Sequence, residues 1–313
     1  MDLNLEQSLL RLNLPYAICP VSPVEPEAVN AYRQWISEGK QAGMQYLEKY
    51  DPVRANPELL LPGAKSMLIV AFPYRFEAEI QLPIALYARG KDYHDVVRDY
   101  LKPVAALIPG ESRICVDSAP LRERYWAAKS GLGQIGRNNQ LFVPGFGSFC
   151  FIATILTTAL LPSHRPFDFP SPDPCGDCRR CIDACPGKCI PPDGSAIDAR
   201  KCISYLTIEH RGPLPEGLKL RSLYGCDVCQ TVCPLNRQTL PSPIPEFAPS
   251  DAIKTLTLDA IETLTQEQFS TIFRGSPIKR TKLPGLLRNW QNYCSANEVS
   301  GNERNERTKI TNY

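Results

Sequence analysis

Residues 175–186 read Cys-Gly-Asp-Cys-Arg-Arg-Cys-Ile-Asp-Ala-Cys-Pro, and residues 226–234 read Cys-Asp-Val-Cys-Gln-Thr-Val-Cys-Pro. The first run has the Cys-x₂-Cys-x₂-Cys-x₃-Cys-Pro order of bacterial ferredoxins, in which three cysteines hold one 4Fe–4S cluster and the fourth holds a second cluster. The second run ends in the same way, but Leu223, which cannot bind iron, occupies the position of its first cysteine. We expect Cys202, which lies between the runs, to supply the missing ligand.

This arrangement predicts two 4Fe–4S clusters that share ligands by crossover between the runs. Cluster one takes Cys175, Cys178, Cys181 and Cys233. Cluster two takes Cys185, Cys202, Cys226 and Cys229. The other cysteines are expected to be bystanders: Cys19, Cys115, Cys150, Cys294, and Cys189, which we expect to be held too close to cluster one to serve cluster two.

A pair of Cys₄ zinc sites is the alternative interpretation, because zinc sites also use Cys-x₂-Cys pairs. Zinc requires neither a third and fourth cysteine at these spacings nor a proline after each run. The pattern therefore favours iron–sulfur clusters over zinc.

The rest of the composition is that of a globular chain of 313 residues with 13 cysteines and a formal net charge of +2. The sequence begins Met-Asp-Leu-Asn-Leu-Glu, which lacks the basic and apolar regions of a signal peptide. No stretch approaches the roughly 18 apolar residues of a membrane span. We therefore expect a cytoplasmic protein with no membrane partner, in which the cysteines ligate metal rather than form disulfides.

Apolar periodicity predicts a mixture of strands and helices. The expected strands are 16–21, 67–74, 113–116, 139–143 and 148–156, the last two as a pair around a turn. The expected helices are 3–12, 25–50, 84–108, 121–130, 256–273 and 276–288.

Two proline-rich linkers, 162–174 and 241–245, suggest where the chain divides. We expect a mixed helix–sheet domain over residues 1–165, a ferredoxin-like domain over 166–240 and a C-terminal helical segment over 241–313. The last residues, 301–313, are polar and are expected to be disordered.

The C-terminal end is more basic than the rest. From Thr271 onward there are eight Lys or Arg residues against three Glu residues. Such an end could meet phosphates, although charge alone favours a solvated helix face with a disordered tail.

Residues 131–136, Gly-Leu-Gly-Gln-Ile-Gly, match the spacing of a dinucleotide-binding loop. The expected helix 121–130 precedes them, whereas a Rossmann loop follows a strand. The glycines are therefore expected to form a helix C-cap and a turn against a flat ligand rather than a phosphate cradle.

Several further stretches carry a resemblance that is specific in combination. They are Leu59-Leu-Leu-Pro-Gly-Ala-Lys-Ser66, Tyr87-Ala-Arg-Gly-Lys-Asp-Tyr-His94, Val116-Asp-Ser-Ala-Pro120, Lys129 to Asn138, Cys202 to Gly212, Phe273 to Arg280 and Leu287-Arg-Asn289. From about residue 25 to about residue 290, the chain resembles the epoxyqueuosine reductases, cobalamin-dependent enzymes of transfer-RNA modification.

The resemblance implies an α+β fold, with a nitroreductase-like cobalamin-binding domain followed by a ferredoxin-like double 4Fe–4S module and a short helical segment. It implies reduction of epoxyqueuosine to queuosine at the wobble position of tRNA, with the epoxide oxygen leaving as water. It also implies an electron donor such as ferredoxin or flavodoxin, and we expect a monomer. Two departures, Gln134 for an aromatic residue and Arg137 for lysine, could alter the substrate or cobalamin pocket.

Asp117 matches the family's proton donor. A carboxyl group beside an apolar corrin would have a raised pKa and keep its proton at neutral pH, whereas the alternative is a helix cap. His94 could serve cobalt or a phosphate, but a structural role is more common. The resemblance implies cofactor contacts at Arg54, Asp117, Ser118, Gln140, Leu141 and Ser148, and tRNA contacts at His210, Arg211, Lys279, Arg280 and Arg288. For His210 and Arg211, contacts to the corrin edge or to backbone carbonyls remain equally open.

Two other functions compete with this interpretation. A reductive dehalogenase would share cobalamin and two clusters, but it usually carries an export signal and acts on a small substrate. An electron-carrier protein would have the clusters and bind no cobalamin.

Overall fold

The computed structural model describes residues 3–296. A four-stranded antiparallel sheet forms its centre, with the order β1 (Tyr16–Pro20), β2 (Ser66–Pro73), β6 (Cys150–Thr157) and β3 (Ser112–Val116). The register sets Ile69 of β2 and Cys115 of β3 on either side of Thr154 of β6. This sheet confirms four of the strands that the apolar runs predicted.

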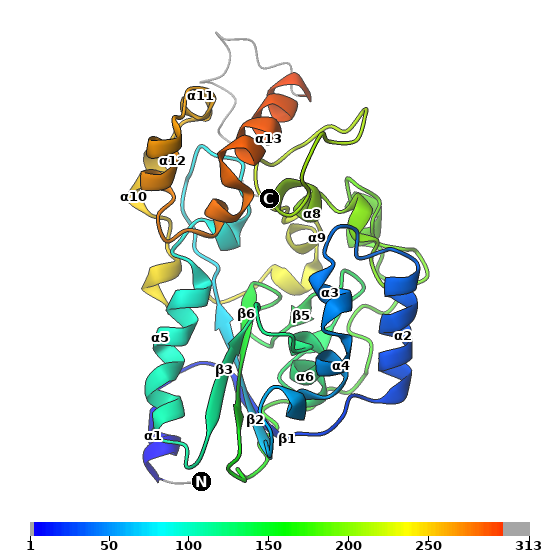
Figure 1. The fold of residues 1–313 in the computed structure, drawn as a ribbon, viewed down its shortest axis with the longest axis vertical. Coiled ribbons are helices and arrows are strands. Elements are labelled where there is room, and N and C mark those ends of the chain that lie inside the picture. The colour runs from blue at the N-terminus through cyan, green and yellow to red at the C-terminus, as the bar shows by residue number, and fades with distance from the viewer. Residues whose placement is uncertain (1–2, 297–313) are drawn as a thin grey trace.

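All eight residues of β2 are buried, because helices or loops cover both faces of the sheet. Leu68, Val70 and Phe72 point to the face that α1 (Leu3–Leu12) and α5 (Tyr93–Ala106) cover. Met67 and Ile69 point to the opposite face, which α6 (Glu123–Lys129) covers. The alternation follows the two-residue period of a strand, and Figure 1 shows the two layers of helix with the sheet between them.

The helix expected over residues 25–50 is wrong in extent. The chain forms α2 (Pro26–Ser37), α3 (Tyr46–Lys49) and α4 (Asp51–Ala55) instead. Gly39 and Ala42 have positive φ angles of 68° and 56°, which a helix cannot contain. The Asp51-Pro52 pair begins a helix rather than ending one, since proline suits the first turn.

The helix expected over residues 84–108 also begins later, at Tyr93. The Asp92 side chain accepts the backbone N–H of His94 and so caps α5. The preceding stretch forms the short 3₁₀ helix η2 (Leu86–Ala88). After η2, Gly90 packs closely against the backbone of Phe247.

The expected pairing of strands 139–143 and 148–156 is wrong. The short strand β5 (Leu141–Phe142) pairs with β4 (Gln134–Ile135), while β6 joins the central sheet. A single bridge between Val143 and Gly147 closes the turn that separates them.

The cysteine-rich region contains short helices: α7 (Arg180–Ala184), η3 (Ala199–Lys201), α8 (Ile203–Ile208), α9 (Val228–Thr231) and η4 (Pro234–Asn236). Buried hydrogen bonds join it to the sheet domain. The Gln230 amide donates to the Ser148 carbonyl at 2.9 Å and to the Tyr74 hydroxyl at 3.2 Å. The Asn236 amide donates to the Ser148 hydroxyl at 2.9 Å. These bonds fix the cysteine loops relative to β6.

The C-terminal segment forms η5 (Pro245–Phe247), α10 (Asp251–Thr255), α11 (Leu258–Glu262), α12 (Gln266–Ile272), η6 (Pro277–Thr281) and α13 (Lys282–Ala296). The helix expected over 256–273 is therefore two helices, because Thr265 and Gln268 form a capping box that starts α12. The segment packs on Leu82, Ile84 and Tyr224 in one apolar cluster.

The sheet domain, the cysteine-rich region and the C-terminal segment thus pack against one another. The domain boundaries at residues 165 and 240 stay predictions. The predicted disorder of residues 301–313 falls outside the described residues. Within residues 3–296, no helix is long and apolar enough to cross a membrane.

Candidate active site

Five thiols line one cavity of about 260 Å³ between the cysteine loops and the sheet domain. They belong to Cys185, Cys189, Cys202, Cys226 and Cys229. Among the described residues, no three His, Cys, Asp or Glu side chains are placed to hold a single metal ion. The thiols instead surround a space larger than one ion needs, which suits a 4Fe–4S cluster.

The structure gathers the other four predicted ligands in a second group. Burial is the main cause that raises the pKa of the Cys233 thiol, and the neighbouring Cys175, Cys181 and Cys178 raise it further. The first cysteine run and the end of the second therefore face each other, as crossover ligation requires. Likewise, the pKa of Cys229 is raised by burial and then by its neighbours, among them Cys226, Cys202 and Cys185.

Cys189 does not lie where we expected it. Its side chain is 5% exposed and its sulfur lies 3.4 Å from that of Cys185, inside the cluster-two cavity. The expectation that Cys189 is held near cluster one is wrong, because the turn after Pro186 brings the chain back toward Cys185.

The glycine-rich loop after α6 packs against cluster one. Gly131 ends the helix with a φ angle of 80°, as a C-cap should. A Cβ atom at Gly136 would lie 2.6 Å from the Phe142 ring and 3.3 Å from the Cys175 sulfur. The predicted C-cap is thus confirmed. The loop that follows it packs against the side chains of Phe142 and Cys175.

Both departures from the family pattern lie in this loop. The Arg137 backbone N–H donates to the Cys175 sulfur at 3.4 Å, and its guanidinium donates to the carbonyls of Gly176 and Cys178 at 2.6 and 3.3 Å. The Gln134 amide donates to the Ser171 carbonyl. Arg137 therefore supports the first cysteine loop, and Gln134 contacts the linker.

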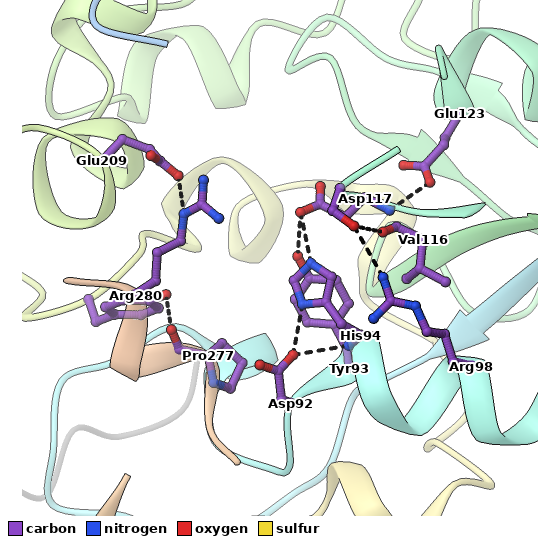
Figure 2. Close-up of polar contacts among 12 residues, drawn as sticks. Asp92, Tyr93, His94, Arg98, Val116, Asp117, Glu123, Glu209, Pro277 and Arg280 are labelled. Carbon is purple, nitrogen blue, oxygen red and sulfur yellow. Dashed lines mark hydrogen bonds and ion pairs between the residues drawn. The ribbon is translucent and has the colours of Figure 1, made fainter. Parts of the chain in front are cut away.

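Asp117 follows the last residue of β3 and has a φ angle of 50°, which is rare for a residue with a side chain. Its carboxylate accepts a hydrogen bond from the Tyr93 hydroxyl at 2.9 Å and contacts Nε2 of His94 at 3.2 Å. Its backbone N–H donates to the Glu123 carboxyl at 2.8 Å. Figure 2 shows the carboxylate pointing toward His94 and Tyr93 from the end of the strand.

The first turn of α5 holds His94 in place. Nδ1 of His94 lies 2.8 Å from Asp92 Oδ1, which also accepts the backbone N–H of His94 at 3.0 Å. The His94 ring stacks on Tyr93, and Tyr93 stacks on Phe151 of β6 with ring centres 4.2 Å apart. The imidazole is therefore fixed between two carboxylates, Asp92 and Asp117.

The charges of this group depart from our expectation. Burial would lower the pKa of His94, but hydrogen bonds to Asp117 and Asp92 outweigh it and raise that pKa to about 9. Burial would raise the pKa of Asp117, but the bonds with His94 and Tyr93 lower it. Without a corrin beside it, the Asp117 carboxylate is 56% exposed and pairs with His94, and a protonated Asp117 next to the cofactor stays a prediction. Burial, followed by the charge of Asp117, raises the pKa of Glu123 to about 8.

The predicted cofactor residues occupy different surroundings. The Nε atom of Arg54 is buried and has no hydrogen-bond partner among the described residues. Ser118 is exposed beside Asp117 and accepts from Arg98 at 3.2 Å. Gln140 lines the cluster-two cavity. Leu141 and Ser148 are only 4% and 2% exposed, so a contact there would have to use backbone atoms or follow a rearrangement.

The predicted tRNA residues, by contrast, come together. The Arg211 guanidinium donates to the Arg280 carbonyl at 3.0 Å, and the His210 ring contacts the Pro213 carbonyl at 2.8 Å. Arg280 pairs with Glu209, and Figure 2 shows this pair on the side of the site opposite Asp117. Lys279 is exposed beside them.

Arg288 lies in different surroundings. Its guanidinium donates to the carbonyls of His210 at 3.0 Å, Gly212 at 2.9 Å and Leu206 at 2.9 Å. Nε and Nη2 also donate to the Asn289 side chain. These bonds occupy the five N–H donors of an arginine. Arg288 therefore holds the loop that carries His210, and a phosphate contact at Arg288 stays a prediction.

Comparison with known proteins shows to which family this chain belongs. Residues 54–118 match the family described as "Epoxyqueuosine reductase QueG, DUF1730", and residues 174–236 match "4Fe-4S double cluster binding domain". An epoxyqueuosine reductase of Cellulophaga algicola is 37% identical over 291 residues, which cover 89% of this chain and 94% of that protein. One from Gloeobacter violaceus is 36% identical over 289 residues, covering 87% and 88%. The chain belongs to the epoxyqueuosine reductase family.

Solved epoxyqueuosine reductases share the fold. One, in complex with an epoxyqueuosine-modified tRNA-Tyr stem loop, has a TM-score of 0.83 and 26% identity, over 94% of this chain and 80% of that chain. The enzyme from Streptococcus thermophilus has a TM-score of 0.83 and 25% identity, over 97% and 83%. The enzyme from Bacillus subtilis, with its catalytic aspartate loop swung out of the active site, has a TM-score of 0.78 and 25% identity, over 94% and 80%. The family and the mixed helix–sheet fold with a double-cluster domain are thus confirmed.

Sequence reasoning missed three residues that contact Asp117 or His94. Tyr93 and Asp92 are next to His94 in the sequence, and an aspartate two residues before a histidine at a helix start was the available signal. Glu123 gives no comparable signal, because only the tertiary structure sets its carboxyl against the Asp117 N–H.

Proposed function

We propose that the protein reduces epoxyqueuosine to queuosine in tRNA, with cobalamin and two 4Fe–4S clusters as its cofactors. The observation that carries the proposal is the exposed Asp117 carboxylate, held by His94 and by Tyr93, which connects it through Tyr87 to the thiol-lined cavity. Tyr87, whose ring centre lies 6.3 Å from that of Tyr93, lines the same cavity. Proton-carrying and electron-carrying groups thus lie in adjoining parts of the fold.

The reaction balances with two electrons and two protons. Both carbon–oxygen bonds of the epoxide break, a carbon–carbon double bond forms, and the oxygen leaves as water. One carboxyl group supplies only one proton, so a second proton donor is needed. His94, whose pKa is raised to about 9 chiefly through Asp117 and Asp92 against the effect of burial, carries that second proton at neutral pH.

The contacts suggest how these protons move. Asp117 receives a proton from His94 Nε2 across their 3.2 Å contact and passes it to the epoxide oxygen. Asp92 holds Nδ1 of the same ring, which keeps the imidazole aligned and stabilises its charge. The Tyr93 hydroxyl fixes the direction of the carboxylate. The second proton reaches the departing oxygen through Asp117 once His94 is protonated again from solvent.

The residues present fit a cobalamin. The buried Nε of Arg54, which has no partner among residues 3–296, offers a donor for an amide or phosphate of the cofactor. Ser118 and Asp117 are exposed at the end of β3, and Gln140 lies at the cavity of cluster two. When bound, the cobalt in a low oxidation state would supply electrons to the epoxide carbon. Arg54, Ser118 and Gln140 would hold the cofactor, while contacts at Leu141 and Ser148 stay predictions.

The partner that fits the opposite side is a tRNA anticodon stem loop. His210, Arg211, Lys279 and Arg280 lie on neighbouring segments, and the charge of Arg280 acts on Asp117. Basic residues in this position can meet phosphates around an inserted base. A one-electron donor such as ferredoxin or flavodoxin would reduce the clusters. We further propose that the protein is a cytoplasmic monomer.

The proposal can be tested in a strain that lacks the gene. Expression of the wild-type protein should replace epoxyqueuosine with queuosine in total tRNA, as measured by nucleoside mass spectrometry. Expression of Asp117→Asn at the same level should leave epoxyqueuosine in place. Epoxyqueuosine that persists with the wild-type protein would contradict the proposed function.

A further inference from the structure

We infer that Cys189 donates an S–H hydrogen bond to the Cys185 ligand of cluster two and thereby raises the reduction potential of that cluster. This inference rests on the proposed cluster assignment. Four thiols suffice for a 4Fe–4S cluster, yet the cavity contains five. Cys189 is the fifth, and its sulfur lies 3.4 Å from that of Cys185.

The direction of this hydrogen bond follows from the chemistry of the ligand. A cysteine bound to iron is a thiolate and carries no proton. The Cys185 sulfur can then only accept, so the proton between the two sulfurs belongs to Cys189. The backbone N–H of Cys189 points at the same sulfur, also at 3.4 Å. The same thiol also contacts the Cys202 sulfur, so every acceptor of the Cys189 S–H group is a predicted ligand of cluster two.

These donors should stabilise the reduced state of the cluster. Reduction adds a negative charge that spreads onto the ligand sulfurs, and hydrogen bonds to those sulfurs stabilise it. Cys189 is 5% exposed, so water does not compete strongly for its proton. Loss of the S–H group should therefore make cluster two harder to reduce.

The two clusters differ in this respect. At cluster one, the contacts shown are backbone hydrogen bonds, among them that of the Arg137 N–H to Cys175. Gly176, Asp177 and Arg179 nearby are exposed. The cluster-two cavity adjoins Tyr87, and Tyr87 adjoins the Tyr93 that holds Asp117. A raised potential at cluster two would favour electron transfer from the exposed cluster one toward the site of the epoxide.

The test compares Cys189→Ala with Cys189→Ser and with the control Cys19→Ala, a thiol in β1. The three variants and the wild type are purified anaerobically, their iron and sulfide are counted, and both clusters are titrated potentiometrically with EPR detection. We expect about eight irons per chain in every protein. Cys189→Ala should lower the potential of one cluster only, Cys189→Ser should fall between it and the wild type, and Cys19→Ala should match the wild type.

Two results would overturn the inference. An unchanged potential in Cys189→Ala, with full iron, would show that the S–H group does not act on the cluster. A halved iron count in the same variant would make Cys189 a ligand rather than a donor. Wild-type protein that fails to hold about eight irons would instead contradict the proposed function itself, so the two failures can be told apart.

Discussion

Nε2 of His94 lies 3.2 Å from Oδ2 of Asp117, while Nδ1 of the same ring lies 2.8 Å from Oδ1 of Asp92. The ring therefore bridges the cap of α5 and the end of β3. A bridge of this kind favours the charged imidazole, because both of its N–H groups then meet a carboxylate. It also makes the proton of His94 available to the residue that faces the substrate.

The first prediction concerns the titration of His94. In the cluster-loaded protein the imidazole should titrate near pH 9, and in Asp117→Asn its pKa should fall toward the ordinary value of about 6.5. The chain has three histidines, so histidine NMR signals can be assigned with His94→Gln as the reference. A His94 that titrates near 6.5 in the wild type would refute the bridge.

The same pKa sets the expected pH dependence of turnover. A raised pKa means that His94 is protonated below about pH 9 and loses its proton as pH rises through that value. Turnover by the wild type should therefore decline on the alkaline side with an apparent pKa near 9. In His94→Gln this alkaline limb should disappear, and turnover should be low at every pH.

The second prediction is that Asp117→Asn lowers turnover by about 10²–10⁴-fold, because an amide cannot act as the acid. Cluster content and cobalamin binding should be unchanged, as optical spectra and metal analysis can show. Asp95→Asn, at an exposed position in the first turn of α5, is the matched control and should keep wild-type activity. Near-normal turnover in Asp117→Asn would leave Asp117 with a structural role alone.

The cysteine runs predicted the cluster groups because ligand spacing is local: the helices α7 and α9 repeat one short motif. The strands were predictable for a similar reason, since β2 is apolar on both faces and is buried on both. Cys189 was misplaced because a turn after Pro186, which depends on several backbone bonds, decides its direction.

The charge state of Asp117 could not be read from the sequence. His94 is 23 residues away, and only the packing of α5 against β3 brings the two together. The predicted helix boundaries were wrong where single residues decide them. Gly39 ends one helix with its positive φ angle, and Asp92 caps the start of another. The loop-holding bonds of Arg288 could not be predicted, because its carbonyl partners in α8 and the loop that follows lie far away in the sequence.

The third prediction contrasts two basic residues of the C-terminal segment. Lys279→Ala should weaken tRNA binding and reduce its salt dependence by roughly one unit of slope, with unchanged stability. Arg288→Ala should instead lower the free energy of unfolding by about 1–3 kcal/mol, because it leaves partly buried carbonyls without donors. Binding titrations over a range of salt, with thermal unfolding of each variant, measure both effects. An unchanged slope in Lys279→Ala would place the RNA on another surface.

The fourth prediction concerns Cys202, the proposed replacement for the cysteine that is missing at Leu223. Cys202→Ala should leave cluster one intact and lower the iron content to about four per chain. Cys19→Ala should retain about eight. A full iron count in Cys202→Ala would mean that another thiol, of which Cys189 is nearest to Cys185, completes cluster two.

The central claim is that this chain removes the epoxide oxygen of epoxyqueuosine. The most direct measurement uses anaerobic protein loaded with both clusters and cobalamin, a chemical reductant, and a tRNA stem loop carrying epoxyqueuosine. Mass spectrometry of the digested RNA should show epoxyqueuosine converted to queuosine, with a loss of one oxygen atom, by the wild type and by Asp95→Asn. The conversion should be almost absent with Asp117→Asn. Fully loaded wild-type protein that leaves epoxyqueuosine unchanged would contradict the account.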